Sequence, residues 1–276
     1  MKSTPSELPG ELATALDRAR ARLGPIASTL LLFDALGSTN DEAAERSGST
    51  GATPAHAEGL VIVADMQTAG RGRRGHTWFS PAGAGLYVSV VLQPSRARID
   101  PERATMLLTL TAGVALAEGI RHATGLQVDL KWPNDLQVSK RKLGGILAEA
   151  SRNGIGDAVI VGYGVNVCAT AFPPELRDRV TSLESELGRS VDRHHVLVET
   201  LAALAQRYAD LLDGRFDAIL DAWRGLAPGA SGARVTWTTL EGARAGITAG
   251  IDDRGALLVR TADRIERIVS GELAWS

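Results

Sequence analysis

Four short apolar runs separated by polar turns lie between residues 128 and 167, and they restrict the fold more than any other feature of the chain. The runs are 128–132, 136–138, 146–150 and 158–167. The turn sequences Ser139-Lys140-Arg141 and Asn153-Gly154 separate the last three runs. Short connections join neighbouring strands antiparallel, whereas a parallel pair needs a crossover of about a dozen residues or more. We therefore expect an antiparallel meander in this region.

Helical patterns and further apolar runs surround this meander. Buried strands are predicted by the continuous apolar runs at 30–33, 60–64 and 86–92. Helices are predicted by the spacing of apolar residues at 8–23, 194–212 and 216–223. Asp100-Pro101 is a typical helix start, and the helix that it begins is expected to run to about residue 122. One more helix is expected from about residue 41, with Thr39 or Asn40 as its cap.

The clearest linker is the sequence from Ala227 to Gly232, which contains proline, glycine and serine. About four short β runs follow it, and they predict a small SH3-like barrel. The expected fold class is α+β, with helices on a mixed, largely antiparallel sheet and this barrel as an appendage. We expect three parts: a helical extension at 1–27, a catalytic domain at 28–226 and the C-terminal domain at 233–276.

Charge and cysteine content exclude several classes of protein. The net charge is −2 at pH 7 and the pI is about 6.2, so no overall positive field favours nucleic acid or an anionic membrane. Cys168 is the single cysteine, which excludes an internal disulfide framework. No apolar run approaches the roughly 20 residues that span a bilayer. We therefore expect a cytoplasmic protein that binds neither membranes nor nucleic acid.

The segment from Gly70 to Gly75, with the sequence GRGRRG, is the most unusual stretch of the chain. Arginine pairs bidentately with phosphate and carboxylate and keeps its charge, while glycines allow the backbone to fold closely around an anion. The segment lacks the Lys-Ser/Thr of a phosphate-binding Walker loop. Two interpretations remain open from this pattern alone, namely an anion-binding loop and a surface loop with solvated charges.

Three further segments combine polar residues with a constrained or glycine-rich backbone. They are KWPND at 131–135, RKLGGIL at 141–147 and VGYGVNV at 161–167. Pro133 favours an extended Trp132, which places Asn134 and Asp135 at the end of a strand. The glycines of the other two segments allow close approach of another group. Each segment also has an alternative interpretation. It is a structural turn for KWPND, a solvated lysine for RKLGGIL and a bulged core strand for VGYGVNV.

Taken together and in this order, the segments resemble the bacterial biotin–protein ligases. The matching stretches are STN at 38–40, QTAGRGRRGHTWFS at 67–80, KWPND at 131–135, RKLGGILAE at 141–149 and GYGVN at 162–166. The resemblance implies the class II synthetase-like catalytic domain of that family, followed by its SH3-like C-terminal domain. About 27 residues precede the catalytic segment, whereas a winged helix-turn-helix needs roughly twice that. The resemblance is thus to the monofunctional type without a DNA-binding domain.

The resemblance implies an ATP-dependent ligase that makes biotinyl-5′-AMP and passes the biotinyl group to a lysine of the biotin carboxyl carrier protein, an acetyl-CoA carboxylase subunit. Biotin and ATP are the implied ligands, with Mg²⁺ as the ATP counter-ion. No metal-binding residues are assigned, and a homodimer is left open. Two alternatives remain: a lipoate- or octanoyl-transferring enzyme of the same fold, and a biotin-responsive DNA-binding repressor.

The resemblance also implies roles for individual residues. The catalytic residues would be Arg73, Lys142 and Asp135. Biotin would be bound by Ser38, Thr39, Asn40, Gln67, Arg71, Gly72, Arg73 and Lys142. ATP and the adenylate would be bound by Arg73, Arg74, Trp78, Asn134 and Asn166. The physical logic is that a carboxylate attacking a phosphate brings two anions together, so that arginines must screen their repulsion. Asp135 is assigned to the acceptor lysine because an ammonium must lose a proton before it attacks.

Overall fold

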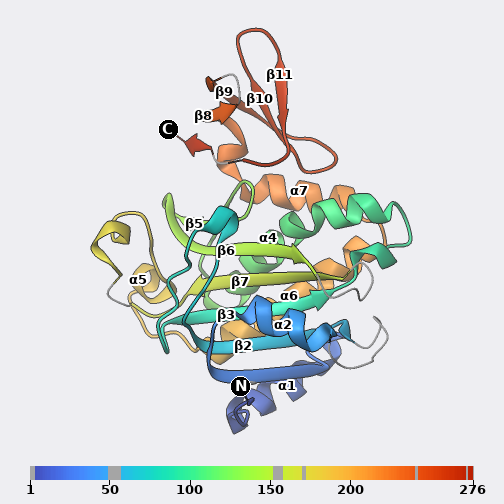
Figure 1. The fold of residues 1–276 in the computed structure, drawn as a ribbon, viewed down its shortest axis with the longest axis vertical. Coiled ribbons are helices and arrows are strands. Elements are labelled where there is room, and N and C mark those ends of the chain that lie inside the picture. The colour runs from blue at the N-terminus through green and yellow to red at the C-terminus, as the bar shows by residue number, and fades with distance from the viewer. Residues whose placement is uncertain are drawn as a thin grey trace.

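The computed structural model of the chain describes residues 4–48, 57–151, 158–169, 172–239, 242–271 and 273–275. Within these ranges the strands form a seven-stranded sheet and a five-stranded sheet. Helices pack on the larger sheet, and the smaller sheet is C-terminal, so the predicted α+β class is confirmed (Figure 1). The predicted turn at Asn153-Gly154 lies outside the described residues.

The seven-stranded sheet has the order β1-β2-β3-β7-β6-β5-β4. Its strands are β1 (Thr29–Leu36), β2 (Leu60–Gln67), β3 (Gly85–Leu92), β4 (Asp129–Lys131), β5 (Asp135–Val138), β6 (Arg141–Ala150) and β7 (Val159–Asn166). The strands β5, β6 and β7 pair antiparallel with their neighbours in sequence, which confirms the predicted meander. Only the pair β1–β2 is parallel among the described strands of this sheet.

Helices cover both faces of the centre of this sheet. The long helices α4 (Pro101–Thr124) and α6 (Arg193–Leu212) lie behind it in Figure 1, and α2 (Thr39–Gly48) lies in front of β2, β3 and β7. Every residue of β3 is buried as a result. A strand buried on both faces must be apolar throughout rather than alternating, which explains the continuous run at 86–92.

Helix α4 is the central core helix. Asp100 caps it by accepting a hydrogen bond from the backbone N–H of Arg103, as the sequence predicts. Gly119 lets α6 approach closely, because a Cβ there would lie 2.6 Å from the Cα of Thr200. By length and composition α4 could cross a membrane, but 72% of its most apolar window is buried inside the protein. Its apolar character is therefore explained by the core.

One local expectation is wrong. Helix α2 begins at Thr39, so Thr39 and Asn40 are its first residues and neither is its cap. The backbone carbonyl of Ser38 instead accepts the N–H of Glu42. The predicted linker at 227–232 contains a short helical turn at Pro228–Ala230 and the start of β8 at Ser231.

Helices α1 (Gly10–Leu23), α5 (Leu183–Leu187) and α7 (Phe216–Leu226) complete the body of the protein. Helix α1 packs on α6 and buries Leu12, Leu16 and Leu23 in the same core. Arg22 of α1 donates two hydrogen bonds to Glu199 of α6, at 2.8 and 2.7 Å. The division into three parts at 1–27, 28–226 and 233–276 stays a prediction.

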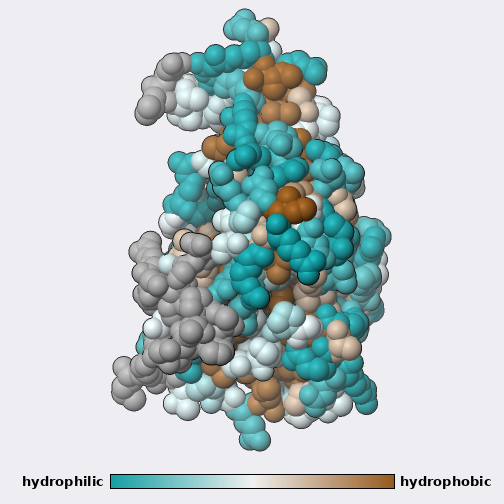
Figure 2. Space-filling view, turned by 90° about the vertical axis from the view of Figure 1, so that its right-hand side faces the viewer, coloured by the Kyte–Doolittle hydropathy of each residue, from teal (hydrophilic) through white to brown (hydrophobic). Residues whose placement is uncertain are grey.

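The C-terminal sheet is antiparallel throughout and has the order β11-β10-β9-β8-β12. Its strands are β8 (Ser231–Thr239), β9 (Gly242–Ile251), β10 (Leu257–Arg260), β11 (Ile265–Ile268) and β12 (Ala274–Trp275). It lies at the end of the molecule opposite α1 (Figure 1). The face in Figure 2 is mostly polar, and its few hydrophobic patches include some on this domain, where Ile247, Ile265 and Val269 are exposed.

Candidate active site

A large basin of about 1170 Å³ opens between the meander, the start of α2 and the C-terminal domain. Every residue that the sequence assigned to the site lines it. They are Ser38, Thr39, Asn40, Gln67, Arg71, Gly72, Arg73, Arg74, Trp78, Asn134, Asp135, Lys142 and Asn166. The C-terminal domain contributes part of the wall, including Trp237 and Trp275. The basin is large enough for a ligand of several fused groups, since small-molecule sites commonly measure about 300–1,000 Å³.

The loop from Gly70 to Ser80 is a small hairpin on the side of this basin. The N–H of Gly72 donates to the carbonyl of His76, and the N–H of Trp78 donates to that of Gly70. The turn contains Arg74 at φ 56° and Gly75 at φ 80°. These backbone N–H groups therefore bond within the hairpin and do not point at an anion.

Two of the three arginines of this loop, Arg71 and Arg73, contact different partners. Arg71 forms ion pairs with Asp41 at 2.5 Å and Glu149 at 2.8 Å. Arg73 is half-buried and donates to Oδ1 of Asn134 at 3.3 Å. Burial lowers the pKa of the Arg73 guanidinium, while the charge of Asp135 acts to raise it. Arginine nonetheless stays charged at working pH, so Arg73 is a desolvated cation at the basin wall.

The uncharged end of the basin is built by α2 and β2. The side-chain oxygen of Gln67 accepts the N–H of Thr39 at 2.9 Å, and its Nε2 donates to Ser80 at 3.0 Å. Asn40 is buried, and its Nδ2 donates to Glu149 at 2.7 Å. Ser38 and Thr39 are also buried. The neutral donors and acceptors of this end suit an uncharged polar group rather than an ion.

The indole ring of Trp78 packs against two glycines that pair with each other across neighbouring strands. Gly145 of β6 and Gly164 of β7 face each other in the sheet, and a Cβ on Gly164 would lie 2.4 Å from the indole nitrogen. That indole nitrogen is buried and has no hydrogen-bond partner among the described residues. The ammonium of Lys142 lies 5.5 Å from the indole ring centre, within cation–π range. The glycines of β6 and β7 therefore make room for an aromatic side chain, which the alternative interpretation of a bulged core strand does not require.

Lys142 and Asp135 form the ion pair at the centre of the basin, with 2.7 Å between Nζ and Oδ1. The side chains of Asn134 and Asn166 each donate a hydrogen bond to the backbone near this ion pair. The amide of Asn134 donates to the carbonyl of Ile146 at 2.7 Å, and that of Asn166 donates to the carbonyl of Thr181 at 3.0 Å. The polar residues of KWPND thus lie next to those of RKLGGIL, although the two segments are separate in sequence.

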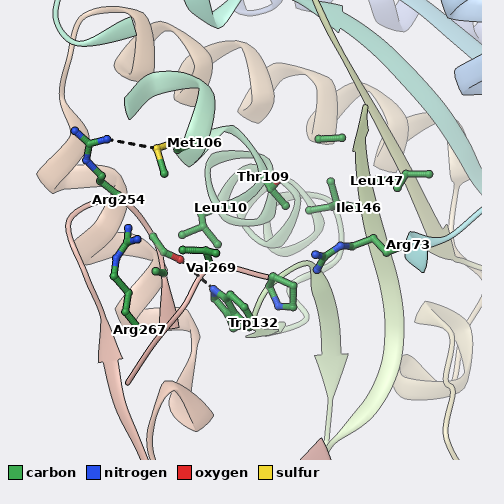
Figure 3. Close-up of a pocket in the computed structure, with 14 residues that line it drawn as sticks. Arg73, Met106, Thr109, Leu110, Trp132, Ile146, Leu147, Arg254, Arg267 and Val269 are labelled. Atoms are coloured by element: carbon green, nitrogen blue, oxygen red, sulfur yellow. Dashed lines mark hydrogen bonds between the residues drawn. The ribbon is translucent and has the colours of Figure 1, made fainter. Parts of the chain in front are cut away.

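Trp132 lines the basin, and its indole nitrogen reaches the C-terminal domain. Its indole nitrogen donates to the carbonyl of Gly255 at 3.0 Å (Figure 3). A second cavity of about 320 Å³ lies here, and Arg73 lines both cavities. Figure 3 shows Arg73 at one side of this cavity, with Arg254 and Arg267 of the C-terminal domain at the other.

Several residues of the site are absent from the sequence-based assignment. Ser89 and Glu149 bond to Asn40, Asp41 pairs with Arg71, and the segment 172–180 closes one side of the basin. Ser89 carries a signal that was available, since it is the one polar residue in the apolar run 86–92. The segment 172–180 carries none, because it reaches the basin through a bridge between Val180 and Lys142.

Comparison with known proteins agrees with this geometry. Residues 42–166 match the Biotin/lipoate A/B protein ligase family, and residues 230–273 match the Biotin protein ligase C terminal domain. The bifunctional ligase/repressor BirA of Bacillus subtilis is 36% identical over 96% of this chain and 79% of its own. The biotin–[acetyl-CoA-carboxylase] ligase of Paracoccus denitrificans is 37% identical over 72% of this chain and 83% of its own.

The solved structure of the Aquifex aeolicus biotin protein ligase in complex with biotin and ATP is also similar. It superposes with a TM-score of 0.75 and 30% identity, covering 90% of this chain and 99% of that one. Both the body and the C-terminal sheet are thus accounted for by one family. This chain belongs to the biotin protein ligase family.

Proposed function

We propose that the basin binds biotin and ATP side by side and that the chain joins biotin to a lysine of a biotin carboxyl carrier protein. One observation carries this proposal. An uncharged polar end, a cationic loop and the Lys142–Asp135 ion pair line one continuous basin. The similar Aquifex structure holds biotin and ATP, and the Paracoccus relative is named for acetyl-CoA carboxylase.

In this proposal the uncharged end receives the ureido ring of biotin. Ser38, Thr39 and Gln67 supply neutral hydrogen-bonding groups, and the ring carries no charge. Asn40 belongs to this end, but the hydrogen bonds of its buried amide are made to protein. Gly72 and Arg71 lie at the neighbouring loop and border the same end.

Activation requires the biotin carboxylate to attack the α-phosphorus of ATP. A phosphorus–oxygen bond forms to biotin, pyrophosphate leaves, and the product is biotinyl-5′-AMP. We assign Lys142 to the biotin carboxylate, which would replace Asp135 as the anion paired with its ammonium. Arg73 and Arg74 screen the repulsion between carboxylate and phosphate, and Arg73 acts more strongly because its guanidinium is partly desolvated.

The nucleotide would lie over Trp78 and beside the two asparagines. Trp78 offers an aromatic face for adenine. Asn134 orients Arg73, since its Oδ1 accepts the guanidinium while its Nδ2 is anchored on Ile146. Asn166 would hydrogen-bond the nucleotide through its side-chain oxygen. Mg²⁺ enters with ATP as the counter-ion of the phosphates, which leave much of its coordination to water.

In the second step the ε-amine of the acceptor lysine attacks the acyl carbon, an amide bond forms and AMP leaves. We assign Asp135 to this lysine, as the carboxylate that orients its ammonium and takes its proton. Arrival of biotin at Lys142 would free Asp135 for that role. Asp135 would then exchange Lys142 for the acceptor lysine as its cationic partner.

The proposal also covers the cellular location, the partner protein and the domain limits of the chain. We infer that the ligase acts in the cytoplasm on an acetyl-CoA carboxylase subunit, without binding membranes or nucleic acid. We also propose domain limits of 28–226 and 233–276, with 1–27 as a helical extension; the two matched segments, 42–166 and 230–273, support a division into a body and a C-terminal domain.

The test is incubation of the full chain with biotin, MgATP and a biotin carboxyl carrier domain, followed by mass analysis of the carrier. We expect the mass of one biotinyl group on one lysine, none without ATP, and none when that lysine is replaced by arginine. Lipoate offered in place of biotin should give no product. A carrier that gains lipoyl and not biotinyl groups would reject the proposal in favour of the lipoate-transferring alternative.

A further inference from the structure

A continuous series of hydrogen bonds runs beneath the uncharged end of the basin and joins the two ends of the loop. We call it the polar chain, and its members in order are Ser80, Gln67, Thr39, Ser89, Asn40, Glu149, Arg71 and Asp41. Its links are between 2.5 and 3.0 Å long. Fully satisfied networks of this kind hold their members in one arrangement.

Asn40 occupies the middle of the polar chain and cannot turn. Its Oδ1 accepts the hydroxyl of Ser89 at 2.6 Å, and its Nδ2 donates to Glu149 at 2.7 Å and weakly to the carbonyl of Leu147 at 3.4 Å. The amide also fills space that a glycine leaves, because a Cβ on Gly162 would lie 2.1 Å from Oδ1. Rotation of this amide would break buried hydrogen bonds, which is costly.

Glu149 is the branch point between the floor of the basin and the loop. One oxygen, Oε2, accepts both Nδ2 of Asn40 at 2.7 Å and Nη2 of Arg71 at 2.8 Å. Hydrogen bonds to a charged acceptor are stronger than neutral ones. Glu149 does not itself line the basin. It bonds to two residues that do line the basin, Asn40 and Arg71.

We propose that Glu149 is a positioning residue for biotin binding, which acts by fixing the Asn40 amide against Gly162. The inference rests on the proposed function, because it takes the uncharged end of the basin as the biotin site. With Asn40 fixed, Ser89 and Thr39 keep their places beneath the ureido ring. The link to Arg71 makes the same carboxylate an anchor for the start of the loop.

The first experiment measures biotin binding to the full chain by calorimetry, with Glu149→Ala and Glu149→Gln. Loss of a charged acceptor for a buried amide should weaken biotin binding about tenfold or more in Glu149→Ala. The KM for ATP should stay within about twofold, because Asn40 does not face the nucleotide. Glutamine keeps an oxygen that can accept both hydrogen bonds, so Glu149→Gln should recover most of the affinity. Wild-type affinity in Glu149→Ala would overturn the proposal.

A second experiment separates action through Asn40 from action through Arg71. Asp41 contacts Arg71 in the polar chain, so Asp41→Asn loosens the loop without removing the acceptor of Asn40. Its effect on biotin affinity should be clearly smaller than that of Glu149→Ala. In an Asn40→Ala background, adding Glu149→Ala should cost little more affinity. A full further loss there, or an equal loss in Asp41→Asn, would overturn the assignment to Asn40.

A thermal unfolding scan accompanies each variant. If Glu149→Ala does not fold, Glu149→Asp gives the same test, because its shorter side chain withdraws the oxygen from Asn40. A wild-type chain that does not bind biotin would refute the proposed function itself. A wild-type chain that binds biotin, with Glu149 variants that bind equally well, would refute this inference alone.

Discussion

The indole nitrogen of Trp132 donates a hydrogen bond to the backbone carbonyl of Gly255, and this bond links the KWPND segment to a turn of the C-terminal domain. Arg103 of α4 donates to the carbonyl of Asp253 in the same turn, at 2.8 Å. The C-terminal domain thus contacts, through this hydrogen bond, the segment that carries Asn134 and Asp135.

Gly255→Ala should weaken this contact. Gly255 has φ 82°, and a Cβ there would lie 2.7 Å from Cδ1 of Leu110. Positive φ costs alanine about 1–2 kcal/mol, and overpacking costs about 1–3 kcal/mol more. Gly250→Ala is the matched control, since Gly250 has φ 99° but no atom within 4 Å of its Cβ position. Urea unfolding should show the larger loss for Gly255→Ala, and equal losses would contradict the packing argument.

Gly164→Ala should displace Trp78 while leaving the backbone unstrained. The added Cβ would lie 2.4 Å from the indole nitrogen, so the ring must move off its glycine floor. If Trp78 carries adenine, the KM for ATP in pyrophosphate release should rise by about tenfold or more. Gly145→Ala should have a smaller effect, because its Cβ would meet its nearest neighbour at 3.3 Å. An unchanged KM for ATP in Gly164→Ala would remove Trp78 from the nucleotide site.

Asp135→Asn should separate the two chemical steps. The amide cannot take a proton from the acceptor lysine, so transfer from preformed biotinyl-5′-AMP should slow by about a hundredfold or more. Formation of the adenylate should be less affected. Single-turnover transfer to the carrier domain measures the first rate, and pyrophosphate release measures the second. Transfer at the wild-type rate would exclude Asp135 as the base.

Limited proteolysis should report closure of the loop over its ligands. Arg74 is exposed at the tip of the hairpin, and the loop offers three trypsin sites at Arg71, Arg73 and Arg74. Ordering of the loop over an adenylate would exclude water from the mixed anhydride and should also exclude protease. Cleavage between Arg71 and Arg74 should slow markedly with biotin and MgATP present. Equal cleavage in both states would argue against closure.

The ion pair between α1 and α6 should make stability depend on pH. Hydrogen bonds from Arg22 lower the pKa of Glu199 below its ordinary value of 4.5, and burial acts in the opposite direction. A lowered folded-state pKa means that the stabilisation is complete above pH 4.5 and is lost as pH falls through the folded-state value. Arg22 is half exposed, so Arg22→Gln should cost no more than about 1 kcal/mol at pH 7.

Urea unfolding of the wild type and of Arg22→Gln across this range checks that prediction. The difference in unfolding free energy should shrink as the pH falls below 4.5. Arg18→Gln on the exposed face of the same helix removes an equal charge without touching Glu199, and it should show little of this dependence. A difference that stays constant with pH would mean that Arg22 acts through packing alone.

The sequence predicted the secondary structure best where one physical rule dominates. Apolar runs with short turns predicted the meander of β5, β6 and β7, and Asp100-Pro101 predicted the start of α4. Errors arose where tertiary contacts outweigh local signals. Thr39 and Asn40 are good capping residues, yet both are inside α2, because their side chains bond to Gln67, Ser89 and Glu149 instead of capping the helix.

The sequence alone indicated the family, and motif order and spacing indicated thirteen candidate site residues, all of which line one basin in the structure. Only the tertiary structure decided which residues these candidates contact. Whether Arg71 faces a ligand or Glu149, and whether Lys142 pairs with Asp135, depends on strands brought together across the sheet. Such distances are set by packing between segments remote in sequence, and no local pattern encodes them.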